Sequence, residues 1–342
     1  MDSSARTITS CSARRPSTAS RRCRHRSVTT VALAGALALA GCGGGDGSEK
    51  KAAAPAASAP AAPPRAPLRE PIAGGPFPTL LVTQAQFLPA KPGGSDSTPG
   101  PAKLLIVRKT EGGWKTTTLE DPESNAFHKA LPWGDGFLTI GANQAKLKTW
   151  KMANGQWQEE THWSPKFGGK FDRLRDIERG DVDGDGKDDL VIATHDQGVI
   201  AVVHPEQDWR VEEVDRQPDT FVHEIEIGDI DGDGVAEFFA SQSKPNKLDE
   251  EQPGQVTMYR HAAGTWQKSI VDAPGDTHAK EILVADVDRD AKSELFVVWE
   301  GAVGAGGQIV RPVTVKEYRF ATGAFTSSVV GSVPDRQMRA IA

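Results

Sequence analysis

Apolar and polar side chains alternate in short runs along most of residues 76–342, and this period of two is typical of β-strands. From residue 170 onward the runs recur in groups of four. Each group has a first strand, an acidic loop, a short apolar second strand, a third strand, and a fourth strand that begins beside an aromatic residue. Four strands in about 50 residues is the arithmetic of one β-propeller blade.

The three clear groups predict these strands in detail. The first strands are 174–179, 222–227 and 280–285, the second strands are 190–193, 238–240 and 295–298, and the third strands are 199–203, 255–259 and 313–318. Two earlier groups have strands but no acidic loop, at 127–131, 137–140 and 147–150, and at 80–83 and 103–107.

The earliest group lacks a first strand, whereas residues 335–342 resemble a first strand with no group after it. We therefore expect the C-terminal strand to pair beside the N-terminal strands and to close a ring, because closure removes open sheet edges. The expected fold is all-β, a five-bladed β-propeller over residues 76–342. The aromatic residues that mark the fourth strands give the same count: Trp114, Trp157, Trp209, Trp266 and Phe325.

Three acidic loops carry carboxylates at positions 1, 3, 5 and 9, and they start 48 and 57 residues apart. This alternation directs oxygens inward around a tight turn, as a hard cation with six to eight oxygen ligands requires, and calcium fits better than magnesium. A glycine at position 6, Gly186 or Gly234, permits the positive φ of the turn. The predicted ligands are Asp181, Asp183, Asp185, the Lys187 carbonyl and Asp189; Asp229, Asp231, Asp233, the Val235 carbonyl and Glu237; and Asp286, Asp288, Asp290, Lys292 and Glu294.

The third loop has Arg289 and Ala291 where the other two have glycine, so we expect it to bind metal more weakly. The alternative for all three loops is a solvated acidic hairpin without metal. Four carboxylates within a few ångströms would then repel one another, which favours a bound cation.

These loops and their flanking strands resemble the FG-GAP/VCBS repeats, which are calcium-binding propeller repeats of integrin α-subunits and bacterial surface proteins. The resemblance covers residues 170–342 well and 77–169 weakly. It implies a calcium-binding propeller, but it does not define a function, because propellers carry many.

The predicted first strands also carry basic–acidic–apolar triplets at one register. Arg175, His223 and Lys280 occupy the basic position, and His128 and Arg339 align with them less securely. These side chains could form a ring that binds an anionic sugar or carboxylate; the alternative is ion pairing between neighbouring blades. A catalytic pair of His223 and Glu224 is disfavoured, because adjacent strand residues point to opposite faces.

The N-terminal segment predicts export. Residues 1–41 combine a basic region with an apolar stretch that is short for a membrane span, and Leu39-Ala40-Gly41-Cys42 resembles a bacterial lipobox, in which Cys42 is lipidated. The alternative is an ordinary secretory signal. Residues 42–75 are rich in Gly, Ala and Pro and predict a disordered tether. Gly43 after the cysteine favours the outer membrane, provided that the host is Gram-negative.

Charge excludes one class of partner. Residues 1–41 hold seven Arg and one Asp, so their removal changes the net charge from −6 to −12, and nucleic acid is not an expected partner. The sequence therefore predicts an exported, lipid-anchored calcium-binding propeller that serves as a binding, adhesion or scaffold module for a protein or glycan. The alternative is a lyase-like carbohydrate-active enzyme that uses residues at the mouth of the channel.

Overall fold

The computed structural model describes residues 79–89, 98–169, 172–245, 253–304 and 306–336. The predicted signal peptide, Cys42 and the tether lie outside these residues. The described chain is built from antiparallel β-sheets, and its one helix is the 3₁₀ turn η1 (Pro205–Gln207). Within these residues, no helix has both the length and the apolar character needed to cross a membrane.

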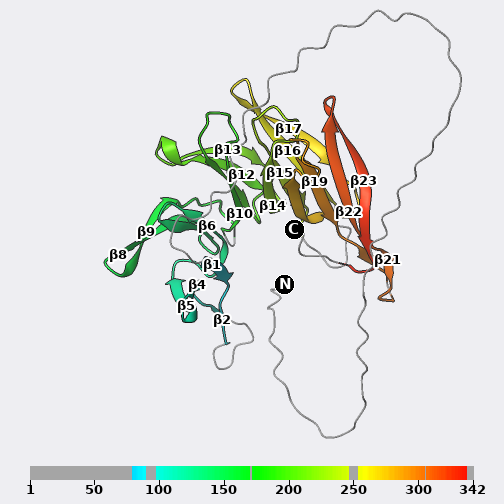
Figure 1. Ribbon diagram of the computed structural model, residues 1–342. Helices are drawn as coiled ribbons and strands as arrows, with labels where there is room; N and C mark the ends of the chain where they lie inside the picture. The colour runs from blue at the N-terminus through cyan, green and yellow to red at the C-terminus, as the bar shows by residue number, and fades with distance from the viewer. Residues whose placement is uncertain (1–78, 90–97, 170–171, 246–252, 305, 337–342) are drawn as a thin grey trace, which may run out of the picture. The chain divides into compact units, whose positions relative to one another are not determined.

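Five sheets follow one another along the chain, and we number them 1 to 5 (Figure 1). Sheet 1 has three described strands, and sheets 2 to 5 have four each, hydrogen-bonded in sequence order. Sheet 1 contains β1 (Thr79–Gln84), β4 (Ala102–Thr110) and β5 (Gly113–Asp121); sheet 2 contains β6 (Phe127–Trp133), β7 (Gly136–Gly141), β8 (Leu147–Ala153) and β9 (Gln156–Trp163).

Sheets 3 to 5 carry the acidic loops between their first and second strands. Sheet 3 contains β10 (Leu174–Gly180), β11 (Asp189–Thr194), β12 (Val199–His204) and β13 (Arg210–Arg216); sheet 4 contains β14 (Phe221–Gly228), β15 (Glu237–Ser243), β16 (Gly254–Ala262) and β17 (Thr265–Asp272); sheet 5 contains β18 (Ala279–Ala285), β19 (Glu294–Trp299), β22 (Val313–Ala321) and β23 (Ala324–Val333). Each matches the predicted group of four strands.

Two small hairpins were not predicted. They are β2 (Phe87–Leu88) with β3 (Thr98–Pro99), and β20 (Ala302–Val303) with β21 (Ile309–Arg311). The second hairpin is inserted between β19 and β22, which nevertheless pair as neighbours.

The apolar core lies between neighbouring sheets. Each of four core clusters joins side chains from two consecutive sheets, such as Val191 and Ile200 of sheet 3 with Phe238 of sheet 4. The central strands are therefore covered on both faces, which is why β11 and β12 are buried at every position while β17 at the outer edge is mostly exposed. The first strands of neighbouring sheets, which we call the inner strands, also lie close to one another: a Cβ at Gly228 would lie 2.3 Å from Cγ1 of Val284 in the next sheet.

The predicted ring closure is not seen in the structure. The five sheets lie in series but are not closed, and residues 337–342, the main part of the predicted closing strand, lie outside the described residues. The preceding residues pair with sheet 5, because the Gly301 amide donates to the Arg336 carbonyl at 2.9 Å and the Val313 amide donates to the Asp335 carbonyl at 3.2 Å.

Candidate functional site

The three acidic loops fold around their own carboxylates in the same way. The position-1 carboxylate accepts backbone amides from later in the loop, as Asp181 does from Gly184 at 2.8 Å and from Gly186 at 2.9 Å. The position-5 carboxylate accepts the amide at position 7, so Lys187, Val235 and Lys292 each donate to it. Gly186 and Gly234 have the predicted positive φ, of 84° and 92°.

The third loop adopts the same backbone without glycine. Arg289 and Ala291 have φ values of 63° and 73°, and the Ala291 amide donates to Asp286 as Gly186 does to Asp181. The sequence change that we expected to weaken this loop therefore leaves its conformation intact and appears as strain in two residues.

The first loop retains an unsatisfied carboxylate oxygen. Asp181, Asp183 and Asp185 each place one oxygen within 4.8 Å of the others, and Asp183 and Asp189 form a second such group with His204. One Asp189 oxygen receives His204 Nδ1 at 2.8 Å, while the other is buried without a hydrogen-bond partner. Burial and the neighbouring Asp183 raise the pKa of Asp189 to about 6, although His204 opposes this. These donors fit a divalent cation.

In the second and third loops, an arginine side chain already pairs with the predicted calcium ligands. Arg260 donates to Asp231 at 2.6 Å and to Glu237 at 2.7 Å, and both acids are predicted calcium ligands. Arg319 contacts Asp288 at 2.7 Å and Glu294 at 3.1 Å in the same manner. Their remaining position-9 oxygens accept the backbone amides of Ile230 and Val287. These two acid sets therefore fit a further divalent cation less well than the first loop does.

The three partners occupy one structural position. Each acid directly precedes the first residue of the second strand that pairs with the third strand. The pairs are Leu190–Val203, Phe238–Tyr259 and Leu295–Tyr318. By the same register, His204 lies opposite Asp189, Arg260 opposite Glu237 and Arg319 opposite Glu294. Sequence reasoning missed these residues. A basic residue directly after each predicted third strand was the available signal.

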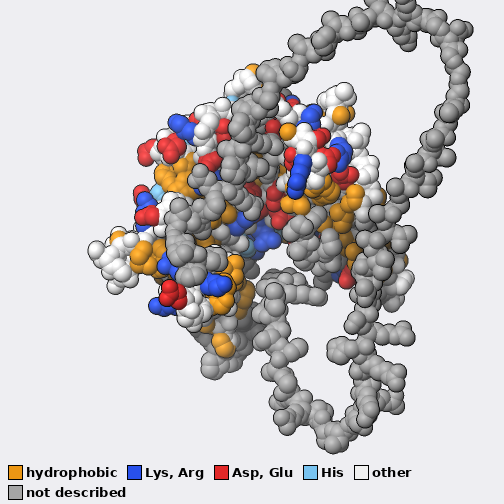
Figure 2. Space-filling model, viewed as in Figure 1, with side chains coloured by type: hydrophobic (Ala, Val, Ile, Leu, Met, Phe, Trp, Pro, Cys, Tyr) orange, Lys and Arg blue, Asp and Glu red, His pale blue; other side chains and the backbone are white. Residues whose placement is uncertain are grey.

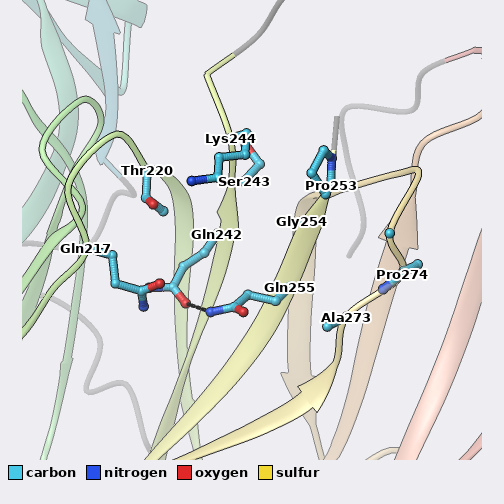
Figure 3. Close-up of a pocket in the computed structure, with 11 residues that line it drawn as sticks. Gln217, Thr220, Gln242, Ser243, Lys244, Pro253, Gly254, Gln255, Ala273 and Pro274 are labelled. Carbon is cyan, nitrogen blue, oxygen red and sulfur yellow. Dashed lines mark hydrogen bonds between the residues drawn. The ribbon is translucent and has the colours of Figure 1, made fainter. Parts of the chain in front are cut away.

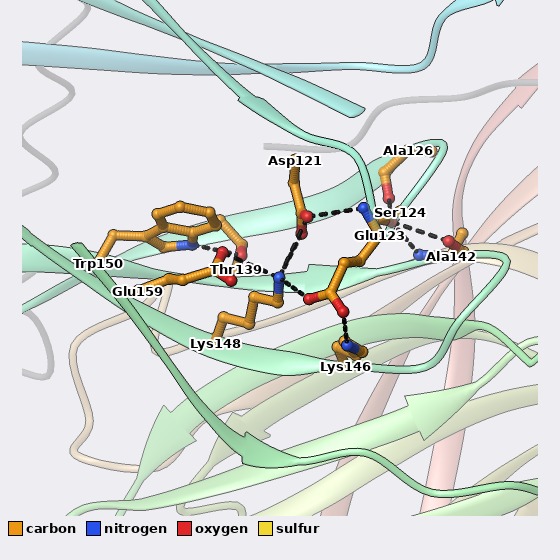
Figure 4. Close-up of polar contacts among 10 residues, drawn as sticks. All are labelled: Asp121, Glu123, Ser124, Ala126, Thr139, Ala142, Lys146, Lys148, Trp150 and Glu159. Carbon is orange, nitrogen blue, oxygen red and sulfur yellow. Dashed lines mark hydrogen bonds and ion pairs between the residues drawn. The ribbon is translucent and has the colours of Figure 1, made fainter. Parts of the chain in front are cut away.

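A further acidic cluster joins sheets 1 and 2, which have no acidic loop, and it surrounds the ammonium group of Lys148 (Figure 4). The Lys148 side chain is 1% exposed and contacts Asp121 at 3.0 Å, Glu123 at 2.7 Å and Glu159 at 2.9 Å. Burial lowers the pKa of Lys148, but its interactions with the three carboxylates together raise that pKa by more. Hydrogen bonds from Lys146 and Lys148 lower the pKa of Glu123 to about 2.

Four of the five predicted basic residues of the first strands lie at β-bulges, and the fifth, Arg339, lies outside the described residues. In each of sheets 2 to 5 the register between first and second strands shifts by one residue, and the extra residue is His128, Arg175, His223 or Lys280. We call these four residues the bulge row. A bulge re-aims its side chain and interrupts the alternation of faces. Figure 2 shows Lys and Arg side chains gathered near the inner strands.

Other histidines and an arginine surround the bulge row. The Arg175 guanidinium lies 3.2 Å from Nδ1 of His128, and the His223 ring lies 5.6 Å from that of His195 and 5.7 Å from that of His278, centroid to centroid. Arg173 contacts His195 and Asp196. Burial and then the positive charge of Arg175 lower the pKa of His128 to about 3, and burial and then Lys280 lower the pKa of His223.

The acids of the same triplets join neighbouring sheets. Asp176 accepts the Ile225 amide of the next sheet at 2.8 Å and pairs with Lys129 of the preceding sheet at 2.9 Å. Glu224 likewise accepts the Ile282 amide at 2.8 Å, while His223 contacts Ser243 at 2.8 Å. His223 and Glu224 thus have different partners. Burial and the charge of Glu281 raise the pKa of Glu224 to about 8.

A cavity of about 230 Å³ is lined in part by Ser243 and Gly254 of sheet 4 (Figure 3). Its wall includes Ser243, which contacts His223, and Gly254, where a Cβ would lie 2.3 Å from that of His278. The other polar lining side chains are amides, a hydroxyl and an ammonium: Gln217, Gln242, Gln255, Thr220 and Lys244.

Comparison with known proteins agrees with the repeat. A family model described as FG-GAP-like repeat matches residues 181–240, which contain the first two acidic loops and the strands between them. No curated protein sequence matches the chain.

Solved structures with similar folds share little sequence with this chain. A protein from Lactobacillus plantarum has a TM-score of 0.41 at 12% identity, over 70% of this chain and 66% of that one. The Pan2 WD40 domain of Neurospora crassa gives 0.38 at 11%, over 70% and 64%, and the Nup133 β-propeller domain of Vanderwaltozyma polyspora gives 0.39 at 9%, over 67% and 71%. The chain thus spans just under two thirds of the first two structures.

Proposed function

We propose that this protein is a binding or scaffold module in which a calcium-stabilised β-propeller presents a ligand site on its inner strands. The observation that carries the proposal is the bulge row: four consecutive sheets interrupt their first strand at the same register and place a basic or histidine side chain there. A bulge repeated at one register is a designed feature, and its usual effect is to re-aim side chains beside a site.

A glycan array probed with the full chain tests the binding function. Saturable retention that free glycan competes away supports it, as does saturable binding to envelope fractions. The absence of saturable binding to either would contradict the proposal.

Calcium belongs to the proposal at the first loop. Asp181, Asp183, Asp185 and Asp189 would hold the ion, which would neutralise carboxylates at the junction of β10 and β11. Because metal binds the folded loop and hardly the unfolded chain, a hundredfold excess over Kd would stabilise by about 2.7 kcal/mol.

Thermal melting tests the metal site. Chelator should lower the melting temperature, and millimolar calcium should restore it better than magnesium does. Asp183→Ala should remove most of the response, whereas Asp288→Ala should remove little, because Arg319 already pairs with Asp288. Equal melting curves in chelator and calcium would contradict a metal role.

We further propose a lipid anchor at Cys42 that holds the module at the cell envelope, in the outer membrane of a Gram-negative host. The lipobox-like residues support this. Cys42→Ser should abolish acyl labelling and release the protein from the membrane fraction. Unchanged fractionation would count against the anchor.

A second function, acid–base chemistry on a glycan, is favoured by one observation. Glu224 has a pKa of about 8, so this carboxyl is protonated at neutral pH close to the bulge row. Turnover of uronate-containing polysaccharides, lost in Glu224→Gln with melting unchanged, would support the enzyme. The absence of turnover across such substrates would exclude it.

A further inference from the structure

We propose that the bulge row binds an oxyanion, meaning a carboxylate, sulfate or phosphate group of a ligand. This inference rests on the proposed binding function and names the chemistry of its ligand. It does not depend on the calcium loops, which lie at the opposite ends of the inner strands: His223 is near the start of β14, whereas Asp229 directly follows its end.

The first argument is convergence. The bulge row places Arg175 and Lys280 on either side of His223 in successive sheets, and the charges of both residues act on the buried His223 ring. Arg175 also contacts His128. Four strands that are hydrogen-bonded to different partners thus direct cations and imidazoles to a common region, and a folding requirement alone does not select basic residues at all four bulges.

The second argument is unsatisfied hydrogen-bonding capacity. Nε2 of His128 and Nε of Arg175 are buried and have no hydrogen-bond partner. Native structures pair nearly all buried polar atoms, so an unpaired donor beside an unpaired imidazole nitrogen indicates a place for a ligand atom. A ligand oxygen that accepts from both groups would satisfy them.

The third argument concerns three nearby carboxyl groups that are already engaged by other groups of the protein. Asp176 is engaged by Lys129 and the Ile225 amide, and Asp196 by Arg173. Glu224 accepts the Ile282 amide, and its pKa of about 8 keeps it largely uncharged at neutral pH. Burial first, and then the cations of the bulge row, lower the pKa of His128 and of His223, so both imidazoles are neutral at neutral pH.

The adjacent cavity suggests how the rest of a ligand is accommodated. Ser243, which contacts His223, and Gly254, which packs against His278, both line a space of about 230 Å³ whose other polar side chains are mostly amides. Amide and hydroxyl groups of this kind bond sugar hydroxyls, so a uronate is the ligand class that uses both features.

Titration calorimetry on the full chain in detergent tests the proposal. Glucuronate, galacturonate, sulfate and phosphate are titrated separately at constant ionic strength, with glucose and chloride as uncharged and simple-anion controls. We expect saturable binding of at least one oxyanion and of neither control. A response to uronates alone identifies a sugar carboxylate, and a response to all four identifies a general oxyanion site.

Matched variants locate the site. Arg175→Gln should weaken oxyanion binding at least tenfold, whereas Arg210→Gln, an exposed arginine of the same sheet, should leave it unchanged. If Arg175→Gln melts early, Lys280→Gln provides the second variant at the same row. No saturable binding of any oxyanion, or equal binding by both arginine variants, would overturn the inference. If glycan-array binding persists in that case, the protein remains a binding module with its ligand elsewhere.

Discussion

A buried carboxylate in this fold requires a cation, and individual residues decide which one it receives. Asp189, Glu237 and Glu294 occupy one position at the start of a second strand, and burial raises the pKa of each. His204 satisfies only part of the first acid, while Arg260 and Arg319 satisfy the other two. A residue opposite the acid can therefore take the place of metal charge, because either cation offsets the desolvation of the carboxylate.

Replacing Arg260 should expose this exchange. Arg260→Met removes the charge that pairs with Asp231 and Glu237, and we expect a loss of about 2 kcal/mol in chelator, between the values for exposed and buried pairs. Calcium should then stabilise the variant more than the wild type, because the second loop becomes a second metal site. Calorimetric stoichiometry rising by one ion would confirm it. Arg210→Met is the control, and unchanged calcium binding in Arg260→Met would refute the exchange.

The backbone conformation of Ala291 leads to a second prediction about a single residue. Its φ of 73° costs an L-residue roughly 1 kcal/mol, and glycine relieves that cost. Ala291→Gly should therefore raise the free energy of unfolding by up to about 1 kcal/mol, less the extra entropy of the unfolded chain. Gly186→Ala in the first loop is the reciprocal test and should destabilise. Denaturant unfolding measures both, and a destabilised Ala291→Gly variant would contradict the strain argument.

At the scale of elements, the strands were predictable and their registers were not. The alternation of apolar and polar residues locates β10, β14 and β18 almost to the residue, because burial of one face imposes that period. The bulges at Arg175, His223 and Lys280 do interrupt that period, because two residues separate the buried apolar positions around each of them, but alternation alone does not say how the strand pairs with its neighbour.

Cross-strand partners were missed for the same reason. Carboxylate spacing within a loop is local and was readable, so the loop residues were found. His204, Arg260 and Arg319 approach those loops only through pairing with a third strand, and Lys148 reaches three acids from separate parts of the chain. Such contacts depend on register, which single-sequence periodicity does not supply.

Loss of the ion pairs of Glu123 with Lys146 and Lys148 should make the folded state less stable at acid pH. The pKa of Glu123 is lowered from 4.5 to about 2 by Lys146 and Lys148, so the folded state holds its proton less tightly than the unfolded chain. The stabilisation is present above about pH 4.5 and is lost as the pH falls toward 2.

Glu123→Gln should flatten the pH dependence of the melting temperature in that window. Glu120→Gln is the control, because Glu120 forms an exposed ion pair with Lys103. An Asp121 contact remains to Lys148 in both variants, which should keep the fold intact. Identical pH profiles for wild type and Glu123→Gln would show that this pair contributes nothing.

At the scale of the whole molecule, the first and last sheets have exposed apolar side chains on an edge strand. Sheet 1 has three described strands, and Leu80 on β1 is 57% exposed, while Val330 on β23 is 52% exposed. Exposed apolar side chains at a strand edge favour association with a further strand. The described chain stops at Arg336 beside Gly301, which follows the end of β19 where that strand pairs with the start of β18. Residues 337–342 lie outside the described residues, so closure of a five-bladed ring by these residues stays a prediction.

Two truncations separate closure from local packing at the C-terminus. Deleting residues 337–342 leaves the hydrogen bonds of Asp335 and Arg336 to sheet 5 in place, and deleting 335–342 removes them as well. If the last residues close the ring, the shorter deletion alone should lower the melting temperature by about 5 °C or more, equivalent to about 2 kcal/mol, because it would leave unpaired edges on two sheets. The longer deletion should add little. If instead the shorter deletion melts like the wild type and only the longer one is destabilised, the C-terminus merely caps sheet 5 and the closed five-bladed arrangement is wrong.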